Sequence, residues 1–399
     1  MALLSGTVSF SRFHVVGGSP KRLDENLLEK FRNHRIGQQR IMRTDHEDVG
    51  WIGGRHILDA EFDIERNVRL DCLHLGMRID ISRVPPDLMR AYVQQELDSL
   101  YRTNGHGNGN GNGHGGARSR GKLKRQAIEA ARQRADDEIK TGRYRRLRQS
   151  PVLWDTGRNM LYLGATTPAV LERLYPLFKE TVGKKLEPMT AGFLSERWTE
   201  NKGITRQLEN LKPAVFVRHP DTNGHGEIYW TAHDAASRDF LGNEFLLWLW
   251  YTLAERSDTI ELADDTEAAV VIVKQLTLEC PRAETGKEVI TCDGPTQLPE
   301  SRRAIQSGKL PRKAGLIVSR QGEQYEFTLQ AETFNISAAK LPKIEENGHG
   351  FAAAEEERVQ QLRHLSDTVD LLFVAFLERR LSTDWESECD KIRAWLKES

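Results

Sequence analysis

The stretch GLIVSRQGEQYEFTLQ (residues 315–330) holds two runs of alternating apolar and polar residues on either side of Gln321-Gly322. Such alternation is typical of strands with one buried face, and a glycine-containing dipeptide between them predicts a tight turn. A second stretch, PVLWDTGRNMLYLGA (residues 151–165), predicts a similar hairpin that turns at residues 155–158. Because hairpins connect the strands more often than regular strand–helix–strand units do, we predict an α+β fold with mixed antiparallel sheets.

Periodicity predicts further elements on both sides of these hairpins. Strands are expected at residues 8–16, 68–81, 214–217, 227–231 and 268–279, and helices from Pro85-Pro86-Asp87 onward and at residues 122–140, 167–182 and 244–254. The last helix carries apolar residues at three- and four-residue spacing, namely Leu362, Leu365, Val369, Leu372 and Phe376. This spacing fits packing on the chain's own core or, less commonly, the seam of a dimer.

The length of 399 residues predicts two or three domains. We place an N-terminal α+β domain at residues 1–85, a helical hairpin at 86–150, a central α+β region at 151–260 and a C-terminal α+β region with a terminal helix at 261–399. The four cysteines are scattered without a CxxC pair, which favours reduced, structural thiols. The start MALLSGTVSF does not resemble a signal peptide, and the most apolar run is too short to span a bilayer, so we expect a cytoplasmic protein without membrane contact.

The tract TNGHGNGNGNGHGG (residues 103–116) separates two predicted helices and contains nothing that could be buried. Its composition is typical of a flexible linker. We therefore predict a protruding antiparallel helical hairpin with this tract at its tip, in which Gly142 ends the second helix.

Residues 118–148 concentrate positive charge, with twelve basic and four acidic residues and a local net charge of +8, whereas the whole chain carries −1. A local field of this kind attracts polyanions whatever the overall charge. Part of the segment is expected to pair with itself, because Arg125–Glu129 and Arg134–Glu138 have the i,i+4 spacing of helical ion pairs.

Two groups of cations in this segment lack an acidic neighbour within a helical turn. The first group is Arg118, Arg120, Lys122 and Lys124, and the second is Arg143, Arg145, Arg146 and Arg148 with Tyr144 among them. A helix of about eighteen residues separates the groups by about 27 Å, so both could reach the phosphates of one duplex. Arginine forks suit phosphate and tyrosine can stack on bases, which predicts DNA binding; a solvated helix face or an acidic protein partner remain alternatives. A weaker basic patch, also a DNA-binding candidate, comprises Lys309, Arg312 and Lys313.

Catalytic motifs are weak by comparison. Residues 111–116 match GxGxxG only formally, because no strand precedes this low-complexity tract. His106, His114, His225 and His349 recur in NGHG units, but glycine-rich loops do not preorganise metal ligands, so we expect neither metal nor cofactor. Asp221 and Glu227 approach the PD…ExK nuclease pattern with tyrosine at the lysine position. A Mg²⁺-dependent nuclease using these two carboxylates is therefore the alternative function.

The order of motifs resembles the RdgC-like recombination-associated proteins of bacteria. The resemblance is carried by Gly50-Trp51, the RVPP entry to a helix at residues 83–86, a basic second helix and an arginine-rich crossing into VLWDTGRNMLYLGA. It continues through a glutamate-rich turn at residues 284–288, a helix–Gly-Lys segment at 298–313, the hairpin at 315–330 and an apolar last helix. Together these features cover about residues 5–381.

The resemblance implies a non-enzymatic homodimeric ring that encircles double-stranded DNA with little sequence preference, associates with the nucleoid, and limits the access of RecA-type recombinase. It assigns DNA contact to residues 122–148 and, less directly, to residues 309–313. The chain departs from the family by glycine-rich inserts at 103–116, 221–226 and 346–350 and by an added tail at 382–399. Relatives tend to present aromatics where this chain has Arg145 and Arg148, so Tyr144 is the nearest substitute for a wedging aromatic.

Overall fold

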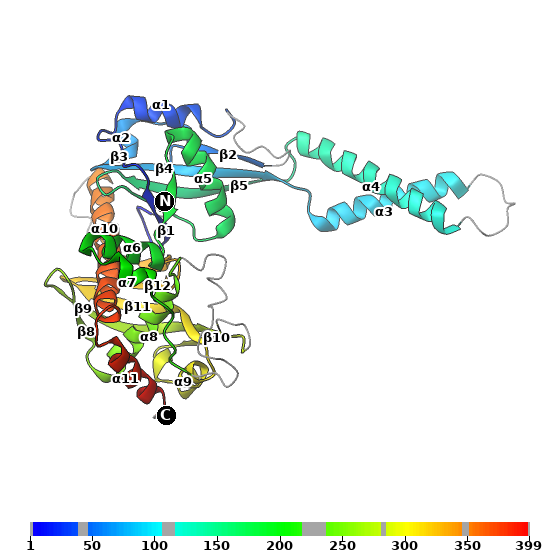
Figure 1. Cartoon of the computed structure of the whole chain (residues 1–399). Coiled ribbons are helices and arrows are strands. Elements are labelled where there is room, and N and C mark those ends of the chain that lie inside the picture. Colours follow the sequence, from blue (N-terminus) through cyan, green and yellow to red (C-terminus); the bar gives the residue numbers. More distant parts are fainter. Residues whose placement is uncertain are drawn as a thin grey trace.

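A computed structural model describes residues 3–38, 47–105, 116–217, 237–280, 285–344 and 351–397. Its strands form a thirteen-stranded antiparallel sheet with the order β10-β9-β11-β12-β13-β1-β6-β5-β4-β2, and β3, β7 and β8 pair with β4, β1 and β9. Helices cover this sheet in two lobes (Figure 1). The predicted α+β class with a mixed antiparallel sheet is confirmed.

The N-terminal lobe is built from the first half of the chain. Its strands are β1 (Val8–Val15), β2 (Glu47–Ile52), β3 (Val68–Arg69), β4 (Cys72–Ser82), β5 (Arg145–Asp155), β6 (Met160–Leu163) and β7 (Leu186–Pro188). Its helices are α1 (Glu25–Asn33), α2 (Ile64–Asn67), α3 (Pro86–Gly105), α4 (Gly116–Lys140) and α5 (Pro168–Val182).

The C-terminal lobe contains the remaining elements. Its strands are β8 (Thr259–Glu261), β9 (Glu267–Glu279), β10 (Lys287–Cys292), β11 (Leu310–Arg320), β12 (Glu323–Gln330) and β13 (Ile336–Lys340). Its helices are α6 (Ala191–Lys202), α7 (Thr205–Glu209), α8 (Phe240–Glu255), the 3-10 helix η2 (Pro295–Gln297), α9 (Pro299–Gln306), α10 (Phe351–Arg380) and α11 (Trp385–Lys397).

Strand β1 joins the two lobes. Its first half pairs with β13 through Val8 and Phe10, and its second half pairs with β6 from Ser11 to His14. The register shifts between Val8 and Phe10, where a bulge accompanies the pairing with β13. One strand therefore belongs to both halves of the sheet.

The two faces of the N-terminal half-sheet have different covers. On one face, α1 and α5 pack on a core that includes Trp51 and Trp154, and the Trp51 indole donates to Thr181 at 2.7 Å. On the other face, Cys72 and Leu153 belong to the larger core shared with α8 and α10.

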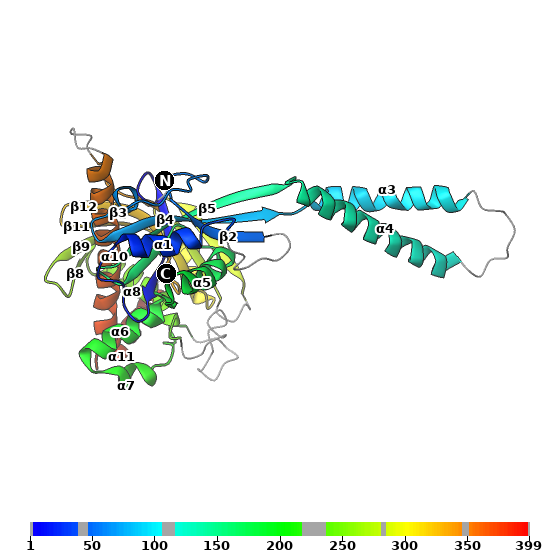
Figure 2. The ribbon, with the colours of Figure 1, turned by 90° about the horizontal axis from the view of Figure 1, so that it is seen from above.

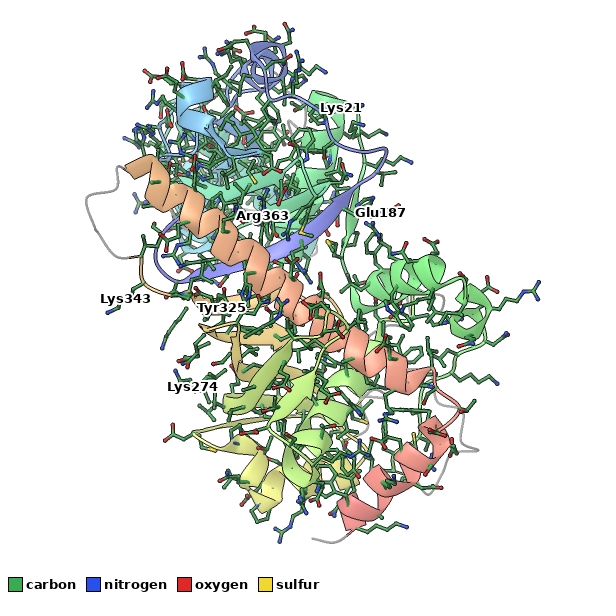
Figure 3. All side chains as sticks on the ribbon, turned by 90° about the vertical axis from the view of Figure 1, so that its left-hand side faces the viewer. Lys21, Glu187, Lys274, Tyr325, Lys343 and Arg363 are labelled. Atoms are coloured by element: carbon green, nitrogen blue, oxygen red, sulfur yellow. The ribbon has the colours of Figure 1, made fainter. Side chains whose placement is uncertain are left out.

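Helix α10 runs across both lobes (Figure 3). Its apolar row, residues 362, 365, 369, 372 and 376, is buried in the chain's own core, which confirms the commoner of the two expectations for it. Arg12 of β1 forms a bidentate pair with Asp370 at 2.6 and 2.8 Å, and Arg363 binds Asp155 of β5 at 2.7 Å. Charged pairs therefore add to apolar packing where α10 crosses the N-terminal lobe.

Several sequence predictions are confirmed. Strands β11 and β12 form the predicted hairpin, and both turn residues have positive φ (Gln321 51°, Gly322 85°), as a two-residue hairpin turn of type I′ requires. Strands β5 and β6 form the second predicted hairpin, and α5, α8 and β9 lie where they were expected.

Other predictions need correction. The strand expected at residues 68–81 is broken at Leu70 (φ 54°), where β3 turns back along β4. The helix expected from residue 122 begins at Gly116. The division into domains stays a prediction, although β5 spans the boundary expected after residue 150.

Residues 214–217 do not form a strand, because their backbone groups bond to helix side chains instead. The Ala214 amide donates to Glu244 at 2.6 Å, and the Val215 carbonyl accepts from Arg393 at 2.8 Å. The expected partner strand at residues 227–231 lies outside the described residues. None of the described helices combines the length and apolar character needed to cross a membrane.

Candidate nucleic-acid interface

A long helical hairpin, here called the arm (α3 and α4), projects from the N-terminal lobe (Figures 1 and 2). It grows from the ends of β4 and β5, here called the ribbon, which pair with each other along their whole length from Cys72↔Asp155 to Ser82↔Arg145, while β2 pairs with the other edge of β4. The predicted protruding helical hairpin is therefore present, and its two helices are carried by one continuous ladder.

The arm holds together through a small apolar core near its base. Pro86 opens α3, where its missing amide hydrogen costs nothing. On α4, Ala127, Ala131 and Ala135 are buried at four-residue spacing, so their small side chains let the helices approach closely. The core is closed by Val84, Leu88, Met89, Tyr92, Val93, Ile139 and Tyr144.

Gly142 ends α4 as predicted. Its φ is 84°, its amide donates to Ile139 at 2.9 Å, and the Arg143 amide donates to Glu138 at 3.3 Å. These bonds satisfy carbonyls that the helix end would otherwise leave unpaired. The chain then turns into β5, with Tyr144 in the left-handed region at φ 63°.

Two tyrosines and a glutamate fasten the base of the arm, and we call Tyr92, Glu138 and Tyr144 the latch. Both hydroxyls donate to Glu138 Oε2 at 2.7 Å, and the two hydroxyl oxygens are 3.1 Å apart. The hydrogen bonds from Tyr92 and Tyr144 lower the pKa of Glu138, and nearby Arg143 and Arg134 act in the same direction. The latch ties α3, α4 and the start of β5 to one carboxylate.

Arg134 and Lys140 are committed to local contacts. The Arg134 guanidinium lies 4.1 Å above the Tyr92 ring, donates to Gln95 at 2.9 Å and lies 3.6 Å from Glu138, which confirms the predicted Arg134–Glu138 pair. Lys140 pairs with Asp137 at 2.9 Å. These two cations are therefore held by protein groups and are poor candidates for a ligand.

The cations nearer the start of α4 have no such local contacts among the described residues. Lys122, Lys124 and Arg125 are exposed, and within the described part of the chain none of them has an ion pair; we call them the tip cluster. The expected Arg125–Glu129 pair is not among the salt bridges of the described residues. Arg118 and Arg120 lie in the first turn and a half of α4, and their side chains are outside the described set.

The second predicted group is split by the alternation of β5. Arg145 faces buried Asp80, to which it donates at 2.5 Å beside Arg78. Arg146 and Arg148 point to the opposite face, opposite Ile81 and Ile79 of β4, and both are exposed. Among the described residues neither has an ion-pair partner, and we call these two arginines the base cluster.

Arg143 and Tyr144 take intermediate positions. Arg143 lies 3.7 Å from Glu138 while two thirds of its side chain is exposed (67%). Tyr144 is partly buried in the core of the arm, and its hydroxyl is bound in the latch. Tyr144 thus has a structural task at the base, and a wedging role would require the latch to open.

The C-terminal basic patch differs in its surroundings. Lys309 is only 4% exposed, and its ammonium group pairs with Glu288 at 2.8 Å. Arg312 binds both Glu279 and Glu332 at 2.9 Å. Lys313 is half-buried on β11, opposite Gln330 of β12. The sequence shows these cations but not the acids that distant strands bring to them. Because Lys309 and Arg312 are already paired with acids, they are poor candidates for binding phosphate.

The described residues contain one group with metal-ligand chemistry, formed by Asp71, Cys72 and Asp155. Arg363 already lies among them, with its guanidinium 2.7 and 2.9 Å from Asp155 and 3.4 Å from the Cys72 sulfur, and it also pairs with Asp71. A guanidinium therefore takes the place that a metal cation would need. Asp221 and Glu227, the nuclease candidates, and the four NGHG histidines lie outside the described residues.

In comparisons with known proteins, the chain matches no family model and no curated protein. The RdgC-like resemblance therefore stays a prediction from the order of motifs.

Proposed function

We propose that the protein binds double-stranded DNA without sequence preference, and that the arm and its base make the contact. The observation that carries this proposal is the set of five exposed cations in the tip and base clusters, which have no ion pair within the described residues. An unpaired surface cation keeps its full attraction for a polyanion, whereas a paired one must first lose its partner.

The spacing of the clusters suits a long, regularly charged ligand. From the tip cluster at Lys122, α4 runs eighteen residues to its end at Lys140, about 27 Å along the helix axis, before the chain turns into β5 and the base cluster. Duplex DNA carries a charge about every 1.7 Å along its axis, so phosphates are available at both clusters whatever the exact register. This tolerance of register supports binding that is indifferent to sequence.

The composition of the clusters also favours backbone contact over base recognition. Lysine and arginine on an open helix and at a strand end can reach phosphate oxygens without entering a groove. The resemblance to RdgC-like proteins leads us to propose further that the chain acts as a homodimer around DNA, in association with the nucleoid, and that it limits access of a RecA-type recombinase.

The proposal is tested by fluorescence anisotropy with two duplexes of unrelated sequence, titrated from about 50 to 200 mM salt. We expect similar affinities for both duplexes and a steep, linear fall of log affinity with log salt. A flat salt response, or strong preference for one duplex, would contradict it. A mass measurement of the free protein in the same buffer tests the dimer, which a monomer would exclude.

A further inference from the structure

We propose that the loop between β2 and α2 forms a second DNA-contacting element, in which Leu58 enters the minor groove and Arg55 accompanies it. This inference rests on the proposed function and adds a contact that the basic segment does not contain. The loop, here called the ribbon loop, comprises residues 53–59, and it lies on the face of the β4–β5 ribbon that carries Arg145.

The ribbon loop is internally fixed by Asp59, which is only 4% exposed. Its carboxylate accepts from the amides of Arg55 at 3.1 Å and Glu61 at 3.2 Å. The main chain closes the loop as well, because Gly53 donates to the Asp59 carbonyl and Asp59 donates to the His56 carbonyl, both at 2.9 Å. The loop is therefore preorganised by its own hydrogen bonds.

The ribbon also holds the loop from below. Gly54, at φ 98°, passes so close to β4 that a Cβ there would lie 2.9 Å from the Leu75 carbonyl carbon. Gln149 of β5 donates to the Gly54 carbonyl at 3.2 Å, and Arg78 of β4 donates to the Ile57 carbonyl at 3.1 Å. Both strands of the ribbon thus fix the loop, from Gly54 at one end to Ile57 at the tip.

The tip displays an apolar side chain beside cationic and polar ones. Leu58 is 67% exposed, the largest exposure among the large apolar side chains described. Arg55 and His56 are exposed too, and the Arg55 side chain has no ion pair in the described part of the chain. A single exposed leucine is ordinary on a surface. A leucine in a hydrogen-bonded loop that also carries an arginine without an ion pair among the described residues has the composition of a groove-binding tip.

The loop is coupled to the base of the arm through one ion-pair network. Arg78 binds Ile57 with one nitrogen and Asp80 with two others, at 2.7 and 2.9 Å, and Asp80 also binds Arg145. Arg145 keeps half of its side chain exposed (50%). Leu58 and Arg145 therefore lie on the same face and are both linked to Arg78. Leu58 follows Ile57, whose carbonyl accepts from Arg78, and Arg145 shares the carboxylate of Asp80 with Arg78.

This arrangement fits the minor groove of a duplex that is held by the tip cluster and passes the Arg145 face of the ribbon, with the base cluster on the opposite face. Proteins that bend DNA commonly insert leucine or a similar apolar side chain between base steps, while arginine follows the negative potential of the groove. Phosphate contacts at the arm would supply binding free energy, and this would offset the cost of partly unstacking the bases at Leu58. The alternative ligand of the ribbon loop is a protein partner with an apolar pocket for Leu58. The experiment distinguishes this partner from DNA.

The test uses a duplex with 2-aminopurine at every adenine of one strand, because unstacking raises the fluorescence of this base. We expect the wild-type protein to raise the fluorescence and Leu58→Ala to return it to the level of free duplex, while the salt dependence of binding stays unchanged. Arg55→Ala should lower the salt slope by about one unit. Leu70→Ala, which shortens another exposed leucine at the opposite end of β4, is the matched control and should behave as wild type.

The outcomes distinguish the two proposals. If the wild-type protein binds the duplex without raising fluorescence, or if Leu58→Ala retains the full rise, the minor-groove inference is wrong and the loop is left to a protein partner, while the proposed function stands. If the wild-type protein does not bind duplex DNA, the proposed function itself is wrong. An equal loss in Leu70→Ala would also overturn the assignment to Leu58.

Discussion

The arm and the C-terminal basic patch contain the same kinds of residue in opposite electrostatic states. On the arm, the cations of the tip and base clusters stand exposed without an ion pair among the described residues. In the patch, Lys309 and Arg312 are held by Glu288, Glu279 and Glu332. A cluster of basic residues in the sequence is therefore available to a ligand only where the fold leaves those residues without acidic partners.

The difference follows from where the acidic partners come from. Along one helix, a cation pairs with acids three or four residues away. Lys122 and Lys124 have no acid at that spacing, and Arg125 has no ion pair among the described residues although Glu129 lies four residues on. A sheet can bring acids from any strand, as when Glu332 reaches Arg312 across the end of β12. In the base cluster, Arg146 and Arg148 lie opposite Ile81 and Ile79, so the neighbouring strand β4 offers them apolar side chains and no acid.

The largest effect is expected from removing the tip cluster. The triple variant Lys122→Ala, Lys124→Ala, Arg125→Ala should bind duplex DNA on the order of a hundredfold more weakly at physiological salt, at about 1 kcal/mol for each lost phosphate contact. Its stability in urea should equal that of the wild type, because these side chains have no ion pair among the described residues to lose. Anisotropy titrations and urea unfolding check both statements.

The matched control removes three exposed lysines elsewhere, Lys343→Ala, Lys391→Ala and Lys397→Ala, two of them on α11 far from the arm (Figure 1). Equal loss of affinity in the control would mean that net charge, and not the arm, governs binding.

The opposite pattern is expected for Arg312→Ala. Losing this guanidinium leaves Glu332, which is 5% exposed, without its ion pair, so the free energy of unfolding should fall by about 2 kcal/mol. DNA affinity should be unchanged. Thermal and urea unfolding measure the first quantity, and Lys313→Ala, one residue away and without an ion pair among the described residues, serves as the stable control. If the variant loses DNA affinity but keeps its stability, Arg312 contacts DNA after all.

A smaller effect is expected at the latch. Tyr144→Phe removes one hydroxyl that donates to Glu138, which should cost about 1 kcal/mol. The variant should keep its DNA affinity at physiological salt, because Tyr144 is assigned to holding the arm and not to stacking on bases. Loss of affinity at unchanged stability would instead support a direct contact between Tyr144 and DNA.

The smallest effect concerns pH. The pKa of Glu138 is lowered by the tyrosine hydroxyls that donate to it, so the stability that it contributes is fully present above its unfolded pKa of about 4.3 and is lost as the pH falls through the lower folded value. The difference in melting temperature between the wild type and Glu138→Gln should therefore shrink toward acid pH. A difference that grows as the pH falls would contradict the latch.

Local patterns in the sequence predicted several elements of the fold and the helical hairpin of the arm. Alternation found β11, β12 and the β5–β6 hairpin, and the tract at residues 103–116 marked the turn between the helices of the arm. Gly142 could be predicted as a helix end because it follows the last helical residues and tolerates positive φ. All of these signals lie within a few residues of the structure that they indicate.

The rest depends on partners that are distant in sequence. Asp80 lies 65 residues before Arg145, and only the register of β4 with β5 shows that they meet and that Arg146 turns the other way. Glu138 looked like a partner for Arg134 alone, yet it also binds Tyr92, which lies 46 residues away. The exposure of Leu58 follows from the closure of its loop by Asp59 and could not be read from hydropathy.

The most direct test of the account is the salt slope of duplex binding for the base cluster. We predict that Arg146→Ala together with Arg148→Ala lowers the slope of log affinity against log salt by about two units relative to wild type. The pair Lys391→Ala with Lys397→Ala should leave the slope unchanged. An unchanged slope in the Arg146/Arg148 variant, or an equal decrease in the α11 variant, would contradict the claim that the unpaired cations of the arm and its base bind the DNA.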